Sequence, residues 1–177
     1  MWALVENNNV TQVFTRPKAL TIGENQYQAN IFNLWSTSEL EALGIYAVVV
    51  DNTNLKDKEY YINTNQIFTF RGGVVTASYN SATARNLDEL KTEHKERINA
   101  QAGSLLAQYD WYTLRAADGG TAVPSNVATY RTAVRAKANE MCNTIDSAPS
   151  VEHLASLYVY SGDPAARPLG EWPTLGS

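Results

Sequence analysis

The spacing of apolar residues changes near Ser81, and this change divides the chain into two kinds of structure. Before Ser81, apolar residues occur in short runs or alternate with polar ones, which is typical of β-strands. After it, they recur every three or four residues, which is typical of one face of a helix. We therefore expect an α+β protein. Its parts are a β-rich module with one short helix (residues 1–80), an antiparallel helical hairpin (residues 81–160) and an extended C-terminal arm (residues 161–177).

Two turn signals within the β-rich module predict β-hairpins. Asn7-Asn8-Asn9 separates two short apolar segments, and Arg71-Gly72-Gly73 separates two more. Asn and Gly tolerate the positive φ angles that tight hairpin turns require. The β-branched run Ile45–Val50 is typical of a buried strand, and we expect it to form a meander with the second hairpin.

A short helix is predicted directly before that run. Ser36 precedes Glu39 by three residues, which is the spacing of a capping box. Gly44 stands where the left-handed residue after a helix belongs. The sequence therefore predicts about two turns of helix between Ser36 and Leu43.

The C-terminal part predicts two long helices and a short one. The first begins at Leu87 and is interrupted at Asp110-Trp111-Tyr112, and the second begins at Pro124 with Ser125 as its N-cap. The short helix runs from Ser150 to Leu157. The predicted buried face of the first helix comprises Leu87, Leu90, Ile98, Ala102, Leu105, Leu106 and Tyr109, and that of the second comprises Val127, Tyr130, Val134, Ala138, Met141 and Ile145. Leu105→Asp is accordingly expected to abolish folding by burying an unpaired charge.

The charge balance opposes a nucleic-acid-binding function. Lys and Arg total 14, Asp and Glu total 18, and neither half of the chain is basic, whereas nucleic-acid binders carry a basic stripe. The longest apolar run, Ile45–Val50, is far shorter than the roughly 20 residues of a membrane span. The first residues also lack the basic segment of a secretory signal. We expect no contact with nucleic acid or a membrane.

The residues that carry catalysis or bind metals are few. Cys142 is a single cysteine, best interpreted as a small buried hydrophobe, and His94 and His153 lack partners at metal-ligand spacing. His94 lies between Leu90 and Ile98 on the helix, which favours a structural, semi-buried role. No phosphate-binding or nucleophile motif is present in the sequence. We therefore expect no cofactor, no metal and no enzymatic activity.

Aromatic residues are abundant, with ten Tyr and four Trp. Both types are enriched in protein interfaces, because they combine a large apolar area with a polar group. We expect Trp35 and Trp111 to lie in the core. The predicted partner interface comprises Trp172 and Tyr160 in the arm and Tyr158 on the short third helix.

Three basic residues lie together on the second long helix: Arg131, Arg135 and Lys137. The two long helices are expected to pack antiparallel. We therefore expect these side chains to form ion pairs with the acidic face of the first helix rather than to bind phosphate.

Several segments together resemble proteins of tailed bacteriophages. The N-terminal part resembles the opening of small tail-associated proteins, and the helical part resembles a domain of tail fibre and tail-fibre-assembly proteins. The matching segments cover about two thirds of the chain. They are Met1–Asn7, Val10, Val13–Pro17, Ile31–Ser36, Glu39-Leu40, Leu43–Tyr46, Leu105-Leu106, Asp110–Tyr112, Leu114-Arg115, Val123-Pro124, Tyr130-Arg131 and Val134-Arg135.

The resemblance implies a structural protein that acts through protein–protein contacts. In one interpretation it is a virion component, a small fibre-like or baseplate adaptor subunit whose β-rich module docks on the tail. In the other it is a tail fibre assembly chaperone that is absent from the mature particle. We expect the first, with synthesis in the bacterial cytoplasm followed by incorporation into the tail. The expected partners are other tail or fibre proteins and further copies of the chain, with a trimer as the first expectation.

Overall fold

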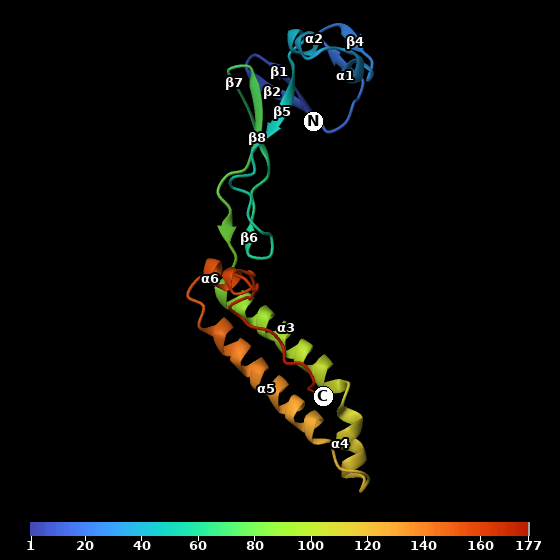
Figure 1. The fold of residues 1–177 in the computed structure, drawn as a ribbon. Coiled ribbons are helices and arrows are strands. Elements are labelled where there is room, and N and C mark those ends of the chain that lie inside the picture. The colour runs from blue at the N-terminus through green and yellow to red at the C-terminus, as the bar shows by residue number, and fades with distance from the viewer. Residues whose placement is uncertain (177) are drawn as a thin grey trace. The chain divides into compact units, whose positions relative to one another are not determined.

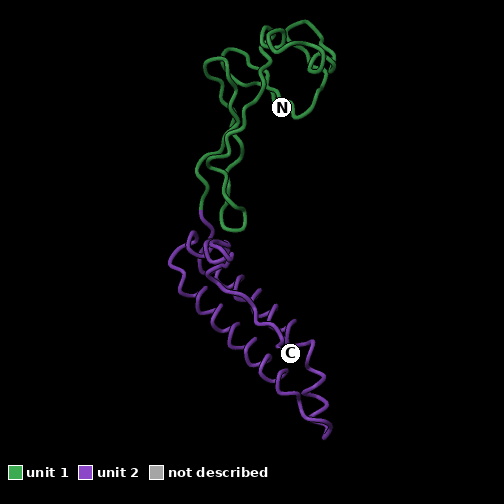
Figure 2. The backbone as a smooth tube through the Cα atoms, viewed as in Figure 1, with its two compact units in different colours: residues 1–83 green, residues 84–177 purple. Residues whose placement is uncertain are grey.

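The structure, a computed structural model, describes residues 1–176 and divides the chain into two compact units. Residues 1–83 form unit 1 and residues 84–177 form unit 2 (Figure 2). Unit 1 holds strands β1 to β8 and two short helices, the two-residue strand β9 spans the boundary, and unit 2 is otherwise mainly helical. The expected α+β class is confirmed. The division falls at 83/84 where the sequence indicated 80/81, and the C-terminal arm is part of unit 2.

Unit 1 is built on a five-stranded sheet. Its order is β2 (Asn9–Phe14), β1 (Trp2–Glu6), β5 (Ile45–Val50), β8 (Val74–Ser78) and β7 (Ile67–Arg71). The outer strands β2 and β7 contact each other, so the sheet is curled. A ladder of β3 (Leu20–Ile22) with β4 (Asn25–Tyr27) and one of β6 (Tyr61–Ile62) with β9 (Thr83–Ala84) complete the strands.

Both predicted hairpins are confirmed. Asn7 and Asn8 connect β1 to β2 with φ angles of 51° and 64°, and Gly72 and Gly73 connect β7 to β8 with φ angles of 57° and 81°. Positive φ at both central residues is the geometry that matches the twist of two antiparallel strands. The local turn chemistry of each segment therefore determines where its strands reverse.

The expected meander is wrong. Strand β8, not β7, lies beside β5, and the β5–β8 pairing is parallel with Val48 opposite Val75. A parallel pair requires a crossover rather than a tight turn. The segment after Asp51 provides it, because it passes β6 and then enters the β7–β8 hairpin at the outer strand.

Two short helices and the β3–β4 ladder cover one face of the sheet. The predicted helix is α2 (Thr37–Ala42), with the capping box complete: Ser36 N donates to Glu39 Oε2 at 2.7 Å, and Glu39 N donates to Ser36 Oγ at 3.3 Å. The sequence indicated one helix, but α1 (Ile31–Leu34) precedes it. The core beneath this layer comprises Leu4, Phe14, Leu20, Ile31, Phe32, Leu40 and Ile45.

The prediction that Ile45–Val50 is a buried strand holds for only part of β5. Ile45 is fully buried, but Val49 is 55% exposed and Val50 is also exposed. Alternation places Val49 on the face of Ile45. The covering layer packs on Ile45 and leaves Val49 open, so a β-branched run does not by itself mark burial on both faces.

Unit 2 is an antiparallel pair of long helices, α3 (Leu87–Ala107) and α5 (Ser125–Asp146), followed by the short α6 (Val151–Ser156) (Figure 1). The predicted hairpin is confirmed. Every residue of the predicted α5 face is buried, while on α3 the buried residues are Leu90, His94, Ile98 and Ala102.

The helix boundaries differ from the prediction in two places. The N-cap of α5 is Pro124 instead of Ser125, which begins the helix. The segment expected to interrupt the helical pattern is itself helix α4 (Asp110–Ala117). It contains no fully buried residue, so it lacks the apolar periodicity from which helices are recognised in a sequence.

The C-terminal arm lies on the helices of its own unit and follows α3 and α5 in Figure 1. Leu169 is buried and its amide donates to the Leu157 carbonyl at 3.0 Å. Trp172 Nε1 donates to Gln101 Oε1 on α3 at 3.1 Å, and Asn126 Nδ2 on α5 donates to the Gly176 carbonyl at 3.3 Å. Across residues 1–176, no helix combines the length and apolar character that crossing a membrane requires.

Candidate protein interface on helix α4

The three residues predicted as a partner interface lie in different environments. Trp172 is half-buried and bonded to α3, as described above. Tyr160 is exposed, and its hydroxyl donates to Glu171 Oε1 at 2.6 Å, which raises the pKa of Tyr160. Tyr158 was expected on the third helix but follows it, because α6 ends at Ser156. Only Tyr160 of the three is largely open to a partner.

Tyr158 is occupied by an internal contact with His94. The Tyr158 hydroxyl lies 2.6 Å from Nδ1 of His94, and the two ring centroids are 4.9 Å apart. His94 is 1% exposed. This agrees with the structural role that the sequence indicated for His94, although the residue is fully rather than partly buried.

The tryptophans expected in the core are exposed instead. Trp35 is 37% exposed and packs edge-on against Tyr27 at 5.9 Å, and Trp111 on α4 is 50% exposed. Leu114, one turn after Trp111, is 66% exposed. The largest mismatch between side-chain chemistry and burial in unit 2 therefore lies on α4.

An aromatic stack connects this exposed tryptophan to the core. The ring of buried Tyr130 meets Tyr109 at 5.4 Å, Tyr109 stacks with Tyr112 at 6.5 Å, and Tyr112 contacts Trp111 at 3.7 Å between centroids. Each ring restricts the next. Trp111 is consequently held in place at the surface without being covered.

Arg115 is fixed beside the two outer rings. Its guanidinium carbon lies 4.8 Å from the Trp111 centroid and 5.4 Å from the Tyr112 centroid, which are cation–π distances. The Gly120 amide donates to the Arg115 carbonyl at 2.9 Å. A Cβ on Gly120 would lie 2.8 Å from that oxygen and 2.9 Å from Arg115 Cγ, so only glycine fits against the arginine stem.

An ion pair attaches α4 to α5. Arg131 is buried, and its Nη1 donates to Asp110 Oδ1 at 2.8 Å and to the Leu106 carbonyl at 2.8 Å. A charge that is nearly desolvated and doubly bonded is costly to disrupt. This contact sets the orientation of α4 at its first residue.

The predicted ion pairs between the basic ridge and the first helix are wrong. Arg131 pairs with α4, and Lys137 pairs with Glu140 on its own helix at 2.8 Å. An ion pair that does cross the hairpin has its basic residue on α3 and its acidic residue on α5. Lys95 of α3 contacts Asp146 of α5 at 2.7 Å, and this bond raises the pKa of Lys95.

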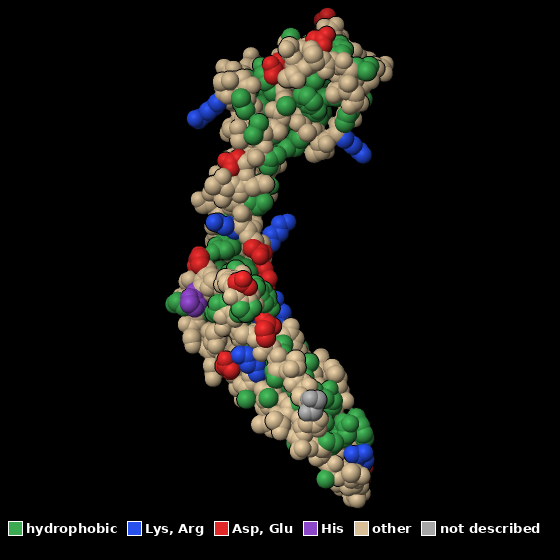
Figure 3. All heavy atoms as spheres, in the orientation of Figure 1, with side chains coloured by type: hydrophobic (Ala, Val, Ile, Leu, Met, Phe, Trp, Pro, Cys, Tyr) green, Lys and Arg blue, Asp and Glu red, His purple; other side chains and the backbone are tan. Residues whose placement is uncertain are grey.

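We define the α4 patch as Trp111, Tyr112, Leu114 and Arg115. Figure 3 shows hydrophobic side chains gathered over α4 with a basic side chain beside them. Trp, Tyr and Arg are the residue types that contribute most to protein–protein binding. The sequence held one signal for this site, the cluster of Trp111, Tyr112 and Arg115 ahead of a Gly-Gly turn, but their exposure was not readable from it.

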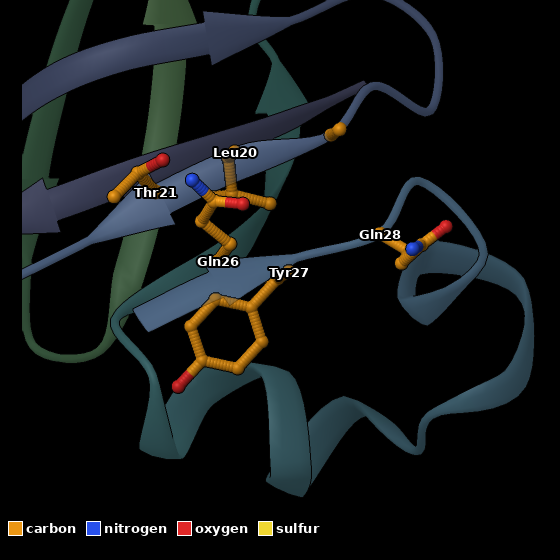
Figure 4. A pocket seen from close by; sticks show the side chains of 6 residues that line it. Leu20, Thr21, Gln26, Tyr27 and Gln28 are labelled. Carbon is orange, nitrogen blue, oxygen red and sulfur yellow. The ribbon is translucent and has the colours of Figure 1, made fainter. Parts of the chain in front are cut away.

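Two concave sites offer less chemistry. A cleft of about 280 Å³ beside the β3–β4 ladder is lined by uncharged side chains; in Figure 4, Gln26 points toward Thr21 while Tyr27 points to the opposite side of the strand. A groove of about 460 Å³ between α3 and the arm includes Leu105 and Arg167, and Arg167 already pairs with Glu171 at 3.0 Å.

Metal-ligating clusters are absent from the described part of the chain. Cys142 is half-buried, and burial raises the pKa of its thiol, so the thiol is protonated at neutral pH. The sequence indicated a buried apolar role, but Cys142 is only half-buried, and its Sγ lies 4.0 Å from Asn99 Oδ1.

No known family model, curated protein or solved structure matches the chain.

Proposed function

We propose that this protein is a structural component of a bacteriophage tail, a small fibre-like or baseplate adaptor subunit that acts through protein–protein contacts. The α4 patch is the observation that carries the proposal. It exposes Trp111 and Leu114 at 50% and 66% on a helix tied to the core by Tyr109 and Arg131. The assignment to a tail rests on the resemblance of the segments described above.

The rigidity of the patch supports a binding role. A partner that covers pre-ordered side chains avoids the cost of ordering them, about 0.5–1.5 kcal/mol for each immobilised side chain. Trp111 and Arg115 are restrained by stacking before any partner arrives. Exposed aromatic side chains of this kind mark interaction sites when they gather in one patch.

A tail fibre assembly chaperone, absent from the mature virion, is the second candidate. The specific observation in its favour is the C-terminal arm, which was expected to lie on a partner. Leu169 is buried within unit 2 and Trp172 bonds to Gln101, so the arm is not free to attach permanently to a neighbouring subunit. The α4 patch serves equally for reversible binding.

Photo-crosslinking combined with mass spectrometry tests the proposal. A photoreactive phenylalanine analogue replaces Leu114 in the chain expressed during infection. Purified particles and infected-cell lysate are then irradiated and analysed separately. The matched control places the same analogue at Ile62 in unit 1, which is 63% exposed.

Near-stoichiometric peptides of the chain in particles, crosslinked through position 114 to a tail protein, support the structural subunit. Crosslinks to a fibre protein in lysate, with the chain absent from particles, support the chaperone. The α4 patch is rejected as the interface if position 114 gives no crosslinks in either sample, or if position 62 crosslinks to the same protein as strongly as position 114 does.

A further inference from the structure

We propose that the α4 patch binds a protein segment that presents a carboxylate flanked by bulky apolar side chains. The inference rests on the proposed function and names the chemistry of its partner. Arg115 would receive the carboxylate, and Trp111 and Leu114 would receive the apolar flanks.

Arg115 is a restrained cation with no counter-ion among the residues that the structure describes. Residues 1–176 provide it with cation–π contacts from Trp111 and Tyr112 but with no ion pair, and its Nε is buried without an acceptor. Arginine binds carboxylates through a rigid planar fork of donors. Because stacking and the close approach of Gly120 already hold the side chain, a carboxylate would meet a preformed donor group.

The nearest carboxylates of α4 are not available to Arg115. Asp110 lies at the other end of the helix and pairs with Arg131. Asp118 is the C-cap residue and is exposed, with no ion pair to Arg115. Within residues 1–176 no carboxylate therefore pairs with Arg115, which favours an acidic group from a partner.

The apolar part of the site limits the partner further. Trp111 stacks on Arg115, and Leu114 lies one turn after Trp111 on the same helix; these two are the large apolar side chains of α4 that are exposed. An ion pair gains strength when neighbouring apolar groups exclude water from it. A purely acidic segment would leave Trp111 and Leu114 exposed to solvent, so the partner must also contribute apolar side chains.

The experiment selects peptides against the full chain. An mRNA-displayed library of random dodecapeptides is enriched on immobilised protein. Enriched peptides are synthesised in two forms, with the acidic residue intact or converted to its amide, and their dissociation constants are measured by fluorescence anisotropy. Both forms are measured on the unsubstituted chain, Arg115→Gln and Arg115→Lys, with Arg71→Gln as the control at an exposed arginine of unit 1.

We expect enriched peptides to carry Asp or Glu beside Leu, Phe, Tyr or Trp. Conversion to the amide should weaken binding about tenfold or more on the unsubstituted chain and on Arg71→Gln. On Arg115→Gln the same conversion should change binding less than about twofold, which is the coupling that a double-mutant cycle isolates. Arg115→Lys should give an intermediate loss, because lysine lacks the fork.

Three results would overturn the inference: no enriched peptide, an enriched set without acidic residues, or an amide penalty that persists in Arg115→Gln. The thermal unfolding of each variant is recorded, and Arg115→Lys provides the comparison if Arg115→Gln is unfolded. Particle analysis answers the separate question of tail function. Peptide binding without incorporation or fibre crosslinks would retain this site and reject the proposed function.

Discussion

The hydroxyl of Tyr158 and Nδ1 of His94 lie 2.6 Å apart, and this contact joins the segment after α6 to the centre of α3. His94 is buried between Leu90 and Ile98 on the α3 face. A polar group in a core contributes to stability when it is hydrogen bonded and costs stability when its partner is removed.

Tyr158→Phe should therefore destabilise unit 2. Loss of a hydrogen-bond partner from a buried polar group costs about 1–3 kcal/mol. Tyr160→Phe is the matched control, because Tyr160 bonds to exposed Glu171, and its effect should stay within about 0.5 kcal/mol. Urea unfolding followed by circular dichroism at 222 nm measures both, and equal midpoints for the two variants would contradict the prediction.

Met141→Asp should prevent unit 2 from folding, whereas Leu105→Asp should be milder. Met141 is fully buried between the long helices, so the substitution places an unpaired charge in the core. Leu105 was expected to behave this way, but it is half-buried in the groove beside Trp172. Far-ultraviolet circular dichroism distinguishes the two: helical signal lost for Met141→Asp and retained for Leu105→Asp. Similar signals would show that position 105 is as buried as position 141.

Gly120→Ala and Gly103→Ala should change stability in opposite directions. The new Cβ at 120 would lie 2.8 Å from the Arg115 carbonyl oxygen, and overpacking of this kind costs about 1–3 kcal/mol. At 103, in the interior of α3, the new Cβ would meet no atom within 4 Å beyond the local backbone of its own helix, so alanine should stabilise by about 0.5–1 kcal/mol. Calorimetric melting temperatures provide the measurement, and a destabilised Gly103→Ala would refute the geometry of α3.

Alkaline pH should weaken unit 2 through Tyr130. Burial raises the pKa of Tyr130 above the ordinary tyrosine value of about 10. Above pH 10 the unfolded chain loses this proton while the folded chain retains it, so the free energy of unfolding falls as pH rises. The contribution is constant below pH 10, and the slope is at most about 1.4 kcal/mol per pH unit for one group.

Urea unfolding of the unsubstituted chain and of Tyr130→Phe, at pH 7, 9 and 11, checks this dependence. The two chains should respond alike between pH 7 and 9. From pH 9 to 11 the unsubstituted chain should lose more stability than the variant. Parallel losses would place the alkaline sensitivity on another group.

The features predictable from the sequence are those that depend on neighbouring residues. The turns at Asn7-Asn8 and Gly72-Gly73 and the capping box at Ser36 follow from the chemistry of two to four adjacent residues. The buried face of α5 follows from a period of three to four residues, which Met141 and Ile145 continue to its last turn. The structure keeps these local features because no tertiary contact favours a different conformation of the same residues.

The features that could not be predicted depend on distant residues. Val48 pairs in parallel with Val75, and nothing in the sequence of either strand indicates which other strand it will pair with. The α4 patch was missed because tryptophan is usually buried in a core. The exposure of Trp111 depends on the orientation of α4, which the ion pair between Asp110 and Arg131 sets. Tyr158 illustrates the opposite case, since an aromatic assigned to a partner is bonded inside its own unit.

Strand β5 has a register that two independent neighbours specify. Its first half is aligned by β1, with Ala47 opposite Trp2, and its second half by β8, with Val50 opposite Ala77. A slip by one residue would reverse which side chains face the core. Here a slip against one neighbour would also break the alignment with the other. The double alignment therefore fixes which side chains of β5 point to each face of the sheet.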